Sequence, residues 1–310
     1  YSPYSGAGTC GHWLFEPQST NLVTYSSDFS QFLNISDVSI TTGFTAPDGT
    51  NTANKIVDTG GNAHIAGYNG INTGKRKSIY ARTVSGTGKI FLLNSNNDPN
   101  ALFDLTEQWQ RFEIEHSGAD FFYAVDFRDA SVNLSEVLIW GAQLEELSHA
   151  SSYIPTSGST VTRNQEAAFG AGSSDLINST EGVLYAEIAA LTDDAVGRPI
   201  SISDGTTSNR INLFFPASQT QVVGRVSSGG VIVADMLYTG INQSLFNKIA
   251  VKYKANDFAL WVNGVEVLTD TSGAAPVGLK ELAFDNAAGA KFYGKTKCVA
   301  VFKEALTDDE

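Results

Sequence analysis

Apolar and polar residues alternate with a period of two along most of this 310-residue chain, and no long segment keeps a helical period. Successive side chains of a β-strand point to opposite faces, so this alternation is typical of half-buried strands. The dipeptide Asn263-Gly264 stands between the runs ALWV and VEV, and Asn-Gly favours the type I′ turn of a tight hairpin. The sequence therefore predicts an all-β fold of antiparallel strands.

The candidate strands fall into two groups. In the first half they are residues 55–58, 77–84, 88–93, 109–115, 121–127 and 137–144. In the second half they are residues 182–190, 198–203, 210–215, 221–227, 231–237, 246–254, 257–262, 265–270, 279–286 and 291–302. Short strands separated by regular turn signals are typical of sandwiches.

The stretch between the two groups, residues 148–174, is rich in Ser, Thr, Gly and Ala and holds few large apolar residues. Such a composition is typical of a linker on a protein surface. We therefore expect two tandem antiparallel β-sandwiches of the jelly-roll type. The expected boundaries are a lead-in segment 1–20, a first sandwich 21–162, a linker 163–174 and a second sandwich 175–310.

The net charge of the chain limits the classes of partner that it is expected to bind. The sequence has 20 Lys and Arg against 33 Asp and Glu, a net charge of −13. This excess repels phosphate backbones, so we do not expect a nucleic-acid partner. Hydrophobic residues make up 42% of the chain, which is enough for packed cores and argues against disorder. No stretch approaches the roughly 18 apolar residues of a membrane span, so membrane insertion is not expected.

The two ends of the sequence suggest a piece of a longer polypeptide. The chain begins at Tyr1, and no apolar segment typical of a signal peptide follows. Near the other end, Thr307 and Glu310 have the spacing of a capping box, which starts a helix. No residues of such a helix follow in this sequence, so we expect further chain at both ends.

Neither the cysteines nor the histidines predict a metal site. Cys10 and Cys298 lack zinc-type spacing and are not expected to pair, and Cys298 lies in an apolar run where a small buried side chain is expected. The four histidines are scattered singly, so no cofactor is predicted. The oxygen-rich segment 94–100 leaves a structural calcium ion as an alternative, although it lacks the Gly and the closing Glu of an EF-hand and a β-turn explains it.

Three ordered motifs in the first half resemble a known group of proteins. GHWLFEPQSTNL at residues 11–22, followed by YSSDF at 25–29, resembles a segment common in bacteriophage tail and other virion proteins. WQRF at 109–112 resembles a strand motif of that family. WGAQLE at 140–145, SYIPT at 152–156 and VTR at 161–163 resemble its closing motif. The resemblance implies a jelly roll similar to a carbohydrate-binding module over residues 21–162.

The second half resembles a concanavalin A-like (laminin G-like) lectin or glucanase sandwich. The residues that carry this resemblance are GVLYAE at 182–187, NKIAV at 247–251, the WVNGV hairpin at 261–265 and the ending at 301–310. The hairpin motif alone is common, so this resemblance is less specific than that of the first half. It implies a sandwich of the concanavalin A-like class over residues 175–310.

Together the resemblances imply a structural and adhesive part of a phage virion fibre or appendage. They imply a host-surface glycan and other virion proteins as partners, a homotrimer as the assembly, and the extracellular virion particle as the location. Two alternatives remain: a polysaccharide depolymerase (glycoside hydrolase or lyase), and a purely architectural virion component without a ligand.

Enzymatic motifs are missing from the sequence, so we do not expect an enzyme and predict no catalytic residue. Glucanases of this fold carry a Glu-x-Asp-x-x-Glu strand whose carboxylates line one face. The nearest approaches here, EIEH at 113–116 and YAEIA at 185–189, lack three acids on one face. No nucleophile elbow, HExxH helix or phosphate-binding loop occurs.

We predict that glycan contacts come from loops, because sandwiches fill their interior with alternating side chains and leave their end loops free to vary. The first candidates, Tyr68 and Asn69, are flanked by glycines and are expected in a loop. The polar turn 204–210 supplies the others, which are Asp204, Asn209 and Arg210. By contrast, three tryptophans lie in strand-patterned segments and are predicted to pack in the cores, namely Trp109, Trp140 and Trp261.

Overall fold

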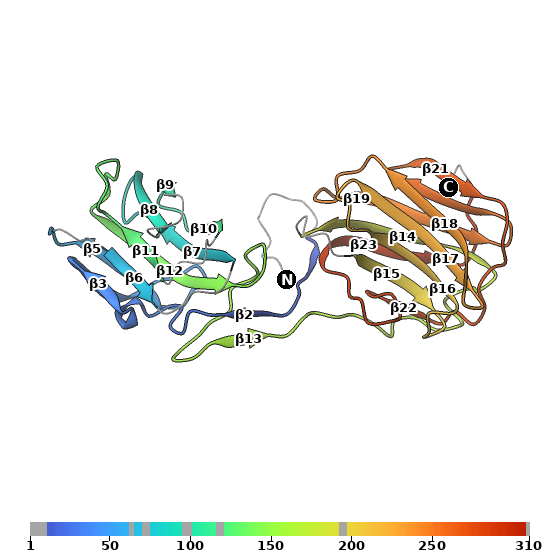
Figure 1. Cartoon of the computed structure of the whole chain (residues 1–310), viewed down its shortest axis with the longest axis horizontal. Coiled ribbons are helices and arrows are strands. Elements are labelled where there is room, and N and C mark those ends of the chain that lie inside the picture. Colours follow the sequence, from blue (N-terminus) through green and yellow to red (C-terminus); the bar gives the residue numbers. More distant parts are fainter. Residues whose placement is uncertain are drawn as a thin grey trace. The chain divides into compact units, whose positions relative to one another are not determined.

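The computed structural model describes residues 11–61, 65–69, 75–94, 101–115, 121–191 and 197–307, with a few strand residues described by their backbone alone. In these residues the regular structure is β-strand, apart from one short 3-10 helix, η1 (Phe29–Gln31). All strand pairs within the sheets are antiparallel. The all-β antiparallel prediction is confirmed (Figure 1).

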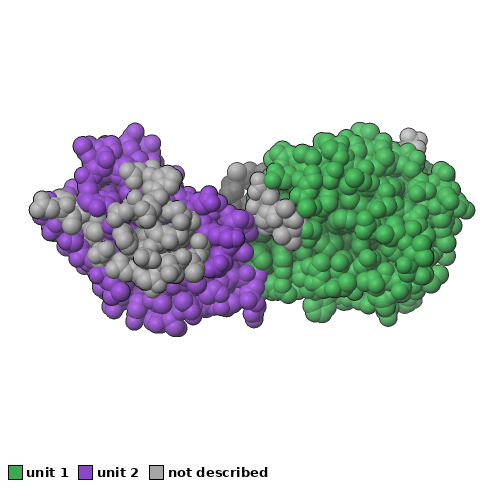
Figure 2. Space-filling view, viewed as in Figure 1, with its two compact units in different colours: residues 1–17, 165–310 green, residues 18–164 purple. Residues whose placement is uncertain are grey.

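The chain forms two compact units (Figure 2). Unit 1 comprises residues 1–17 and 165–310, and unit 2 comprises residues 18–164. The expected lead-in segment 1–20 is divided between them. Strand β1 (Trp13–Phe15) pairs with β23 (Gly294–Phe302) in unit 1, whereas β2 (Ser19–Asn21) pairs with β13 (Val161–Arg163) in unit 2. Unit 1 is therefore built from both ends of the chain.

Unit 2 is a sandwich of two five-stranded sheets with a small two-stranded sheet. The first five-stranded sheet has the order β10 (Gln110–Glu115), β7 (Arg76–Arg82), β12 (Glu136–Glu145), β5 (Ala53–Asp58), β4 (Val38–Phe44). The second has the order β3 (Asn34–Ser36), β6 (Ile65–Asn69), β11 (Phe121–Asp126), β8 (Gly88–Asn94), β9 (Leu102–Leu105). Aliphatic and aromatic side chains of both sheets form one buried core, which includes Ile56, Ile79 and Leu92.

The first and the closing motif that resemble virion proteins meet in a buried polar network inside unit 2. The carboxylate of Glu145, fully buried, accepts hydrogen bonds from Ser19 Oγ at 2.6 Å and from Gln143 Nε2 at 2.6 Å. Asn21, also fully buried, donates to the carbonyls of Ala142 and Ile154 at 3.2 and 2.9 Å. Buried polar groups need such partners. These motifs therefore join the start of unit 2 to its last long strand.

Unit 1 is a sandwich of a six-stranded and a five-stranded sheet. The six-stranded sheet has the order β1, β23, β14 (Glu181–Ala190), β19 (Asn247–Lys254), β20 (Phe258–Val262), β21 (Val265–Asp270). The five-stranded sheet has the order β18 (Val231–Thr239), β17 (Gln221–Ser228), β16 (Arg210–Phe215), β15 (Arg198–Ser203), β22 (Glu281–Ala283). Its core lies between the inner faces of the two sheets and includes Leu184, Leu213 and Leu260.

Strand β1 was not predicted, yet it completes the six-stranded sheet. Its Phe15 packs against the core of unit 1 and stacks on Phe284, with ring centroids 4.4 Å apart, and meets Phe292 edge-on at 5.9 Å. The other strands that the alternation missed are β2, β3, β4, β6, β9 and β13. Most of them are short, so they carry too few alternating residues to stand out.

The three tryptophans predicted to pack in the cores have different environments. Trp140 is buried, as predicted, and its Nε1 donates to Thr52 Oγ1 at 2.8 Å. Trp109 lies just before β10, is half-buried, and packs against the cluster formed by Trp140, Ala46 and Ala53. Trp261 is also half-buried, but it lies on the outer face of the six-stranded sheet, because its neighbours Leu260 and Val262 point into the core. The core prediction is wrong for Trp261.

Cys298 is exposed and free, so the prediction of a buried side chain there is wrong. In the strand register Cys298 of β23 stands opposite Glu187 of β14, next to a register shift between these two strands. Val299 and Val301, the next residues of opposite parity, pack against the core. Cys298 therefore shares the outer face. Cys10 lies outside the described residues, as does segment 95–100 of the calcium alternative and most of the expected C-terminal helix start.

Candidate functional site

Tyr68 and Asn69 lie in strand β6, so the prediction that they belong to a loop is wrong. They pair with Phe122 and Phe121 of β11. A glycine can stand inside a strand, and Gly67 does so here beside a register shift. The structure describes only the backbone of Tyr68 and Asn69, and these two residues lie in unit 2, whereas the other three predicted residues lie in unit 1.

Asp204 and Asn209 organise the predicted polar turn. The Asp204 carboxylate accepts hydrogen bonds from Thr206 Oγ1 at 2.6 Å and from Asn209 Nδ2 at 2.9 Å. Partial burial opposes ionisation of Asp204, but these hydrogen bonds outweigh it and hold its pKa below the ordinary value. The Asn209 amide oxygen accepts from the backbone N–H groups of Gly229 and Val277. Both side chains are therefore engaged within the protein.

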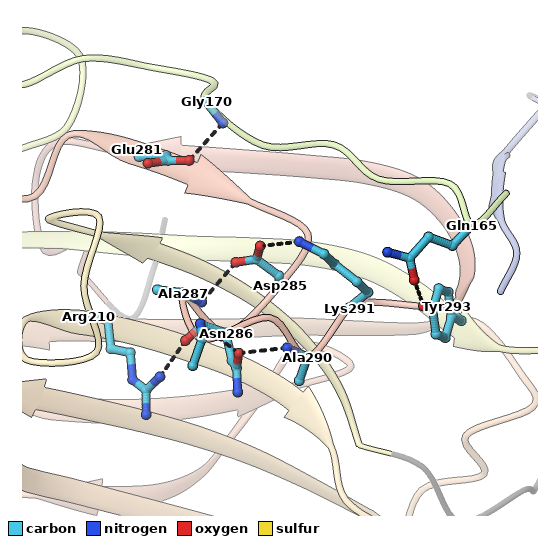
Figure 3. A network of polar contacts seen from close by, with 11 residues as sticks. Gln165, Gly170, Arg210, Glu281, Asp285, Asn286, Ala287, Ala290, Lys291 and Tyr293 are labelled. Carbon is cyan, nitrogen blue, oxygen red and sulfur yellow. Dashed lines mark hydrogen bonds and ion pairs between the residues drawn. The ribbon is translucent and has the colours of Figure 1, made fainter. Parts of the chain in front are cut away.

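Arg210 begins strand β16 on the outer face of the five-stranded sheet, because Ile211 is buried in the core. In the strand register Arg210 stands next to Ser203, and Ser203 stands next to Glu281. Its Nη1 donates to the carbonyl of Asn286 (Figure 3). Its Nε is buried without a hydrogen-bond partner among the described residues. Burial, and then the nearby Arg225, lower the pKa of Arg210.

This outer face borders a cavity of about 290 Å³. Its floor holds Ser203 and Glu281 from the register row of Arg210, together with Ala283 of β22. The loop 285–291 forms one wall. The rim is lined by Phe169 and by Gly205, which belongs to the polar turn. The cavity therefore lies beside the turn predicted from the sequence, although of that turn only Gly205 lines it.

The loop 285–291 is fixed by its own hydrogen bonds. The backbone N–H of Asn286 donates to the carbonyl of Ala290 at 3.1 Å, and that of Ala287 donates to Asp285 Oδ1 at 2.8 Å. Lys291 Nζ pairs with Asp285 Oδ2 at 2.8 Å, and both side chains are mostly buried (Figure 3). A pair of this kind holds the Lys291 donors at a defined place in the cavity wall.

Several hydrogen-bonding groups of the cavity remain open to a ligand. Glu281 Oε1 accepts from the backbone N–H of Gly170 at 2.9 Å, whereas Oε2 has no hydrogen bond among the described residues. Ser203 Oγ accepts from Gly205 N at 3.1 Å and keeps its own proton to donate. Lys291 Nζ carries three donors, of which Asp285 uses one. The cavity thus offers donors and acceptors side by side.

An aromatic ring stands at the rim of the cavity. The Phe169 side chain is 68% exposed, and Lys291 Nζ lies 5.5 Å from its ring centroid. An exposed flat ring can contact the C–H groups of a ligand, and the neighbouring donors and acceptors can bind its hydroxyl groups. Phe169, Glu281 and Lys291 were missed in the sequence. Their signals are weak, because each is a single residue in a segment without a motif.

Metal-binding side-chain groups and membrane-spanning helices are both absent from the described residues. In these residues no group of three His, Cys, Asp or Glu side chains has the arrangement of a metal site. No helix in the same part of the chain has the length and apolar character needed to cross a membrane.

Comparisons with known proteins give structural likeness without sequence similarity. No protein-family description and no curated protein matches the sequence. Among solved structures, one that is similar is the CBM40 module of a Ruminococcus gnavus IT-sialidase bound to alpha2,3 sialyllactose. The match covers 43% of this chain and 80% of that module's chain, with 16% sequence identity and a TM-score of 0.37.

Two further structures match a similar share of the chain. Sheep galectin-11 in complex with glycerol is 9% identical over 44% of this chain and 97% of its own, with a TM-score of 0.31. The carbohydrate-binding module CBM66 from Bacillus subtilis is 13% identical over 44% of this chain and 74% of its own, with a TM-score of 0.29. At these TM-scores the likeness adds nothing to the β-sandwich architecture described above.

Proposed function

We propose that this chain binds a glycan in the cavity of unit 1 next to the loop 285–291. The observation that carries the proposal is the juxtaposition of the exposed Phe169 ring with open polar groups of Glu281, Ser203 and Lys291. Sugar rings stack their C–H faces on aromatic rings, and their hydroxyls both donate and accept hydrogen bonds. Clefts with apolar walls and a few convergent polar groups are the usual form of such sites.

The wider role that we propose is a structural and adhesive part of a phage virion fibre or appendage. It rests on the resemblance of segments 11–29, 109–112 and 140–163 to virion proteins. The partners in this proposal are a host-surface glycan and other virion proteins, the assembly is a homotrimer, and the location is the extracellular virion. Linking several weak sites in a trimer raises avidity by about 10² to 10⁴ without new contacts.

Binding without cleavage is part of the proposal, and a depolymerase is the rival, since Glu281 and Asp285 both line the cavity. Glycosidases use two carboxylates, one as acid and one as nucleophile or base. Here Asp285 is held at both oxygens, by Ala287 N and by Lys291, which favours a structural role for it. Incubation of the full chain with bacterial surface polysaccharide should release no new reducing ends. Their release, lost in Glu281→Gln, would support the depolymerase instead.

The binding claim is tested with a glycan array probed by the full chain and two cavity variants. Phe169→Ala and Glu281→Gln should each weaken binding by about tenfold or more, because each removes one stacking or charge-assisted contact. Leu176→Ala and Glu304→Gln, which change exposed residues of unit 1 outside the cavity, should bind as the unaltered chain does. A blank array, or equal binding by all variants, would contradict the proposal.

A further inference from the structure

A second groove, of about 340 Å³, lies on the outer face of the six-stranded sheet of unit 1. It is lined by the half-buried rings of Trp261 and Tyr185, from β20 and β14. It shares no lining residue with the cavity beside the loop 285–291. The two places are formed by different sheets of the same sandwich.

The strand register gives this groove its shape. Ala250 of β19 stands opposite Trp261 on one side and opposite Tyr185 on the other. All three side chains lie on the outer face, because residues 249 and 251 are buried in the core. Strands are spaced by about 4.8 Å, so the two rings are attached about 10 Å apart with a methyl group between them. The result is a trough with aromatic walls and a small floor.

The groove is also basic, in a chain whose net charge is −13. Lys248 and Lys252 are its charged lining residues, and among the residues that the structure describes no carboxylate lines it. Lys252 Nζ is already paired with Asp257 at 2.9 Å. Lys248 is exposed and has no ion pair among the described residues. Its register neighbour Glu187 pairs with Lys297 at 3.2 Å. Among the described lining residues, a ligand in the trough therefore finds one lysine, Lys248, without an ion pair.

We propose that the groove binds a pyranose ring that carries a carboxylate. The ring lies in the trough against Trp261, and its carboxylate pairs with Lys248. Aromatic walls without a charge would accept a neutral ring equally well, so the free Lys248 decides the class of ligand. Pairing of an ammonium with a carboxylate is stronger than a hydrogen bond between neutral groups.

The experiment titrates the full chain with free glucuronic acid and, separately, with glucose. The indole N–H signals of the tryptophans are followed by NMR, and Trp261→Phe identifies the signal of Trp261. We expect glucuronic acid to move the Trp261 signal, and glucose to move it only at about tenfold higher concentration. Lys248→Gln should weaken the glucuronic acid response about tenfold and leave the glucose response unchanged. Added salt should weaken only the glucuronic acid response.

Lys254→Gln is the matched control, because Lys254 lies on the same strand, is exposed and pairs with Glu181. It should respond as the unaltered chain does. A Trp261 signal that moves with neither sugar would overturn the groove as a site. Equal responses to both sugars, or an unchanged response in Lys248→Gln, would overturn the acidic ligand. The cavity variant Glu281→Gln should leave this titration unchanged, so failure of the proposed glycan cavity is seen separately.

Discussion

Asn209 is 9% exposed, and its amide is bonded at both ends. Its Nδ2 donates to Asp204, and its Oδ1 accepts from backbone N–H groups of two other loops, those of Gly229 and Val277. The sequence predicts Asn209 as a loop ligand, and replacement of an exposed loop residue usually leaves stability nearly unchanged. The structure gives the opposite expectation. A side chain that joins three loops is part of the framework that shapes the edge of the sheet.

Replacement of Asn209 by Ala should therefore lower the free energy of unfolding of unit 1 by about 1–3 kcal/mol, because it leaves buried polar groups without partners. Chemical denaturation of the full chain, followed by the NMR signals of residues in unit 1, measures the change. Thr207→Ala, in the exposed middle of the same turn, is the control and should stay within about 0.5 kcal/mol. Equal stability of the two variants would show that the hydrogen bonds of Asn209 contribute nothing.

The placement of Trp261 follows from the alternation in its own strand. Phe258, Leu260 and Val262 are apolar and have the same parity, so they share the inner face. Trp261 shares its face with Ala259, and the sequence of β20 contains that information. Strand-like surroundings alone do not place a tryptophan in a core, because each strand has two faces.

At the scale of elements, the short strand β2 holds unit 2 together through side chains. Asn21 donates to two carbonyls and accepts from the backbone N–H groups of Val23 and Leu144, at 3.1 and 3.2 Å. Its replacement leaves several buried hydrogen-bonding groups without partners at once. The motif that resembles virion proteins therefore has a structural explanation in this chain, independent of any ligand.

Asn21→Ala should lower the free energy of unfolding of unit 2 by more than about 2 kcal/mol, since each buried unsatisfied group costs about 1–3 kcal/mol. Thermal unfolding followed by circular dichroism gives the change. The neighbouring Thr20→Ala provides the comparison, because the Thr20 hydroxyl bonds to the Thr162 hydroxyl in an exposed pair at 2.7 Å. If both variants melted at the temperature of the unaltered chain, the network would not be a source of stability.

Apart from β4, the long strands could be predicted to within one to three residues at most ends, because their alternation extends over six or more residues. Residues 198–203, 210–215 and 265–270 match β15, β16 and β21 at both ends. Strand β1 could not be predicted, because its partner β23 lies at the other end of the chain and three residues carry no period. The cavity was missed for a similar reason, since it joins segments near residues 169, 203, 281 and 291.

At the scale of the whole molecule, the two units have separate cores. The core of unit 1 draws on residues 15 and 177–301, and that of unit 2 on residues 22–144. Residues 18–164 alone should therefore unfold cooperatively. Residues 165–310 alone lack β1, which leaves the edge of β23 unpaired and removes Phe15 from beside Phe284.

A peptide of residues 11–17 should therefore raise the melting temperature of the 165–310 fragment in a concentration-dependent way, because a ligand that binds the folded state stabilises it. The same peptide with Phe15→Ala should have little effect. Calorimetric melts of the fragments measure both outcomes. A molten 18–164 fragment, or a 165–310 fragment indifferent to the peptide, would contradict the division of the chain into these units.

The most direct test of glycan binding beside the loop 285–291 is an NMR titration of the full, isotope-labelled chain with the strongest glycan from the array. We expect the backbone amide signals of residues 203–205, 281–285 and 287–291 to shift together, with one dissociation constant. In Glu281→Gln the same signals should shift only at about tenfold higher glycan concentration. Shifts confined to unit 2, or a titration in which the signals of these three segments stay in place, would contradict the account.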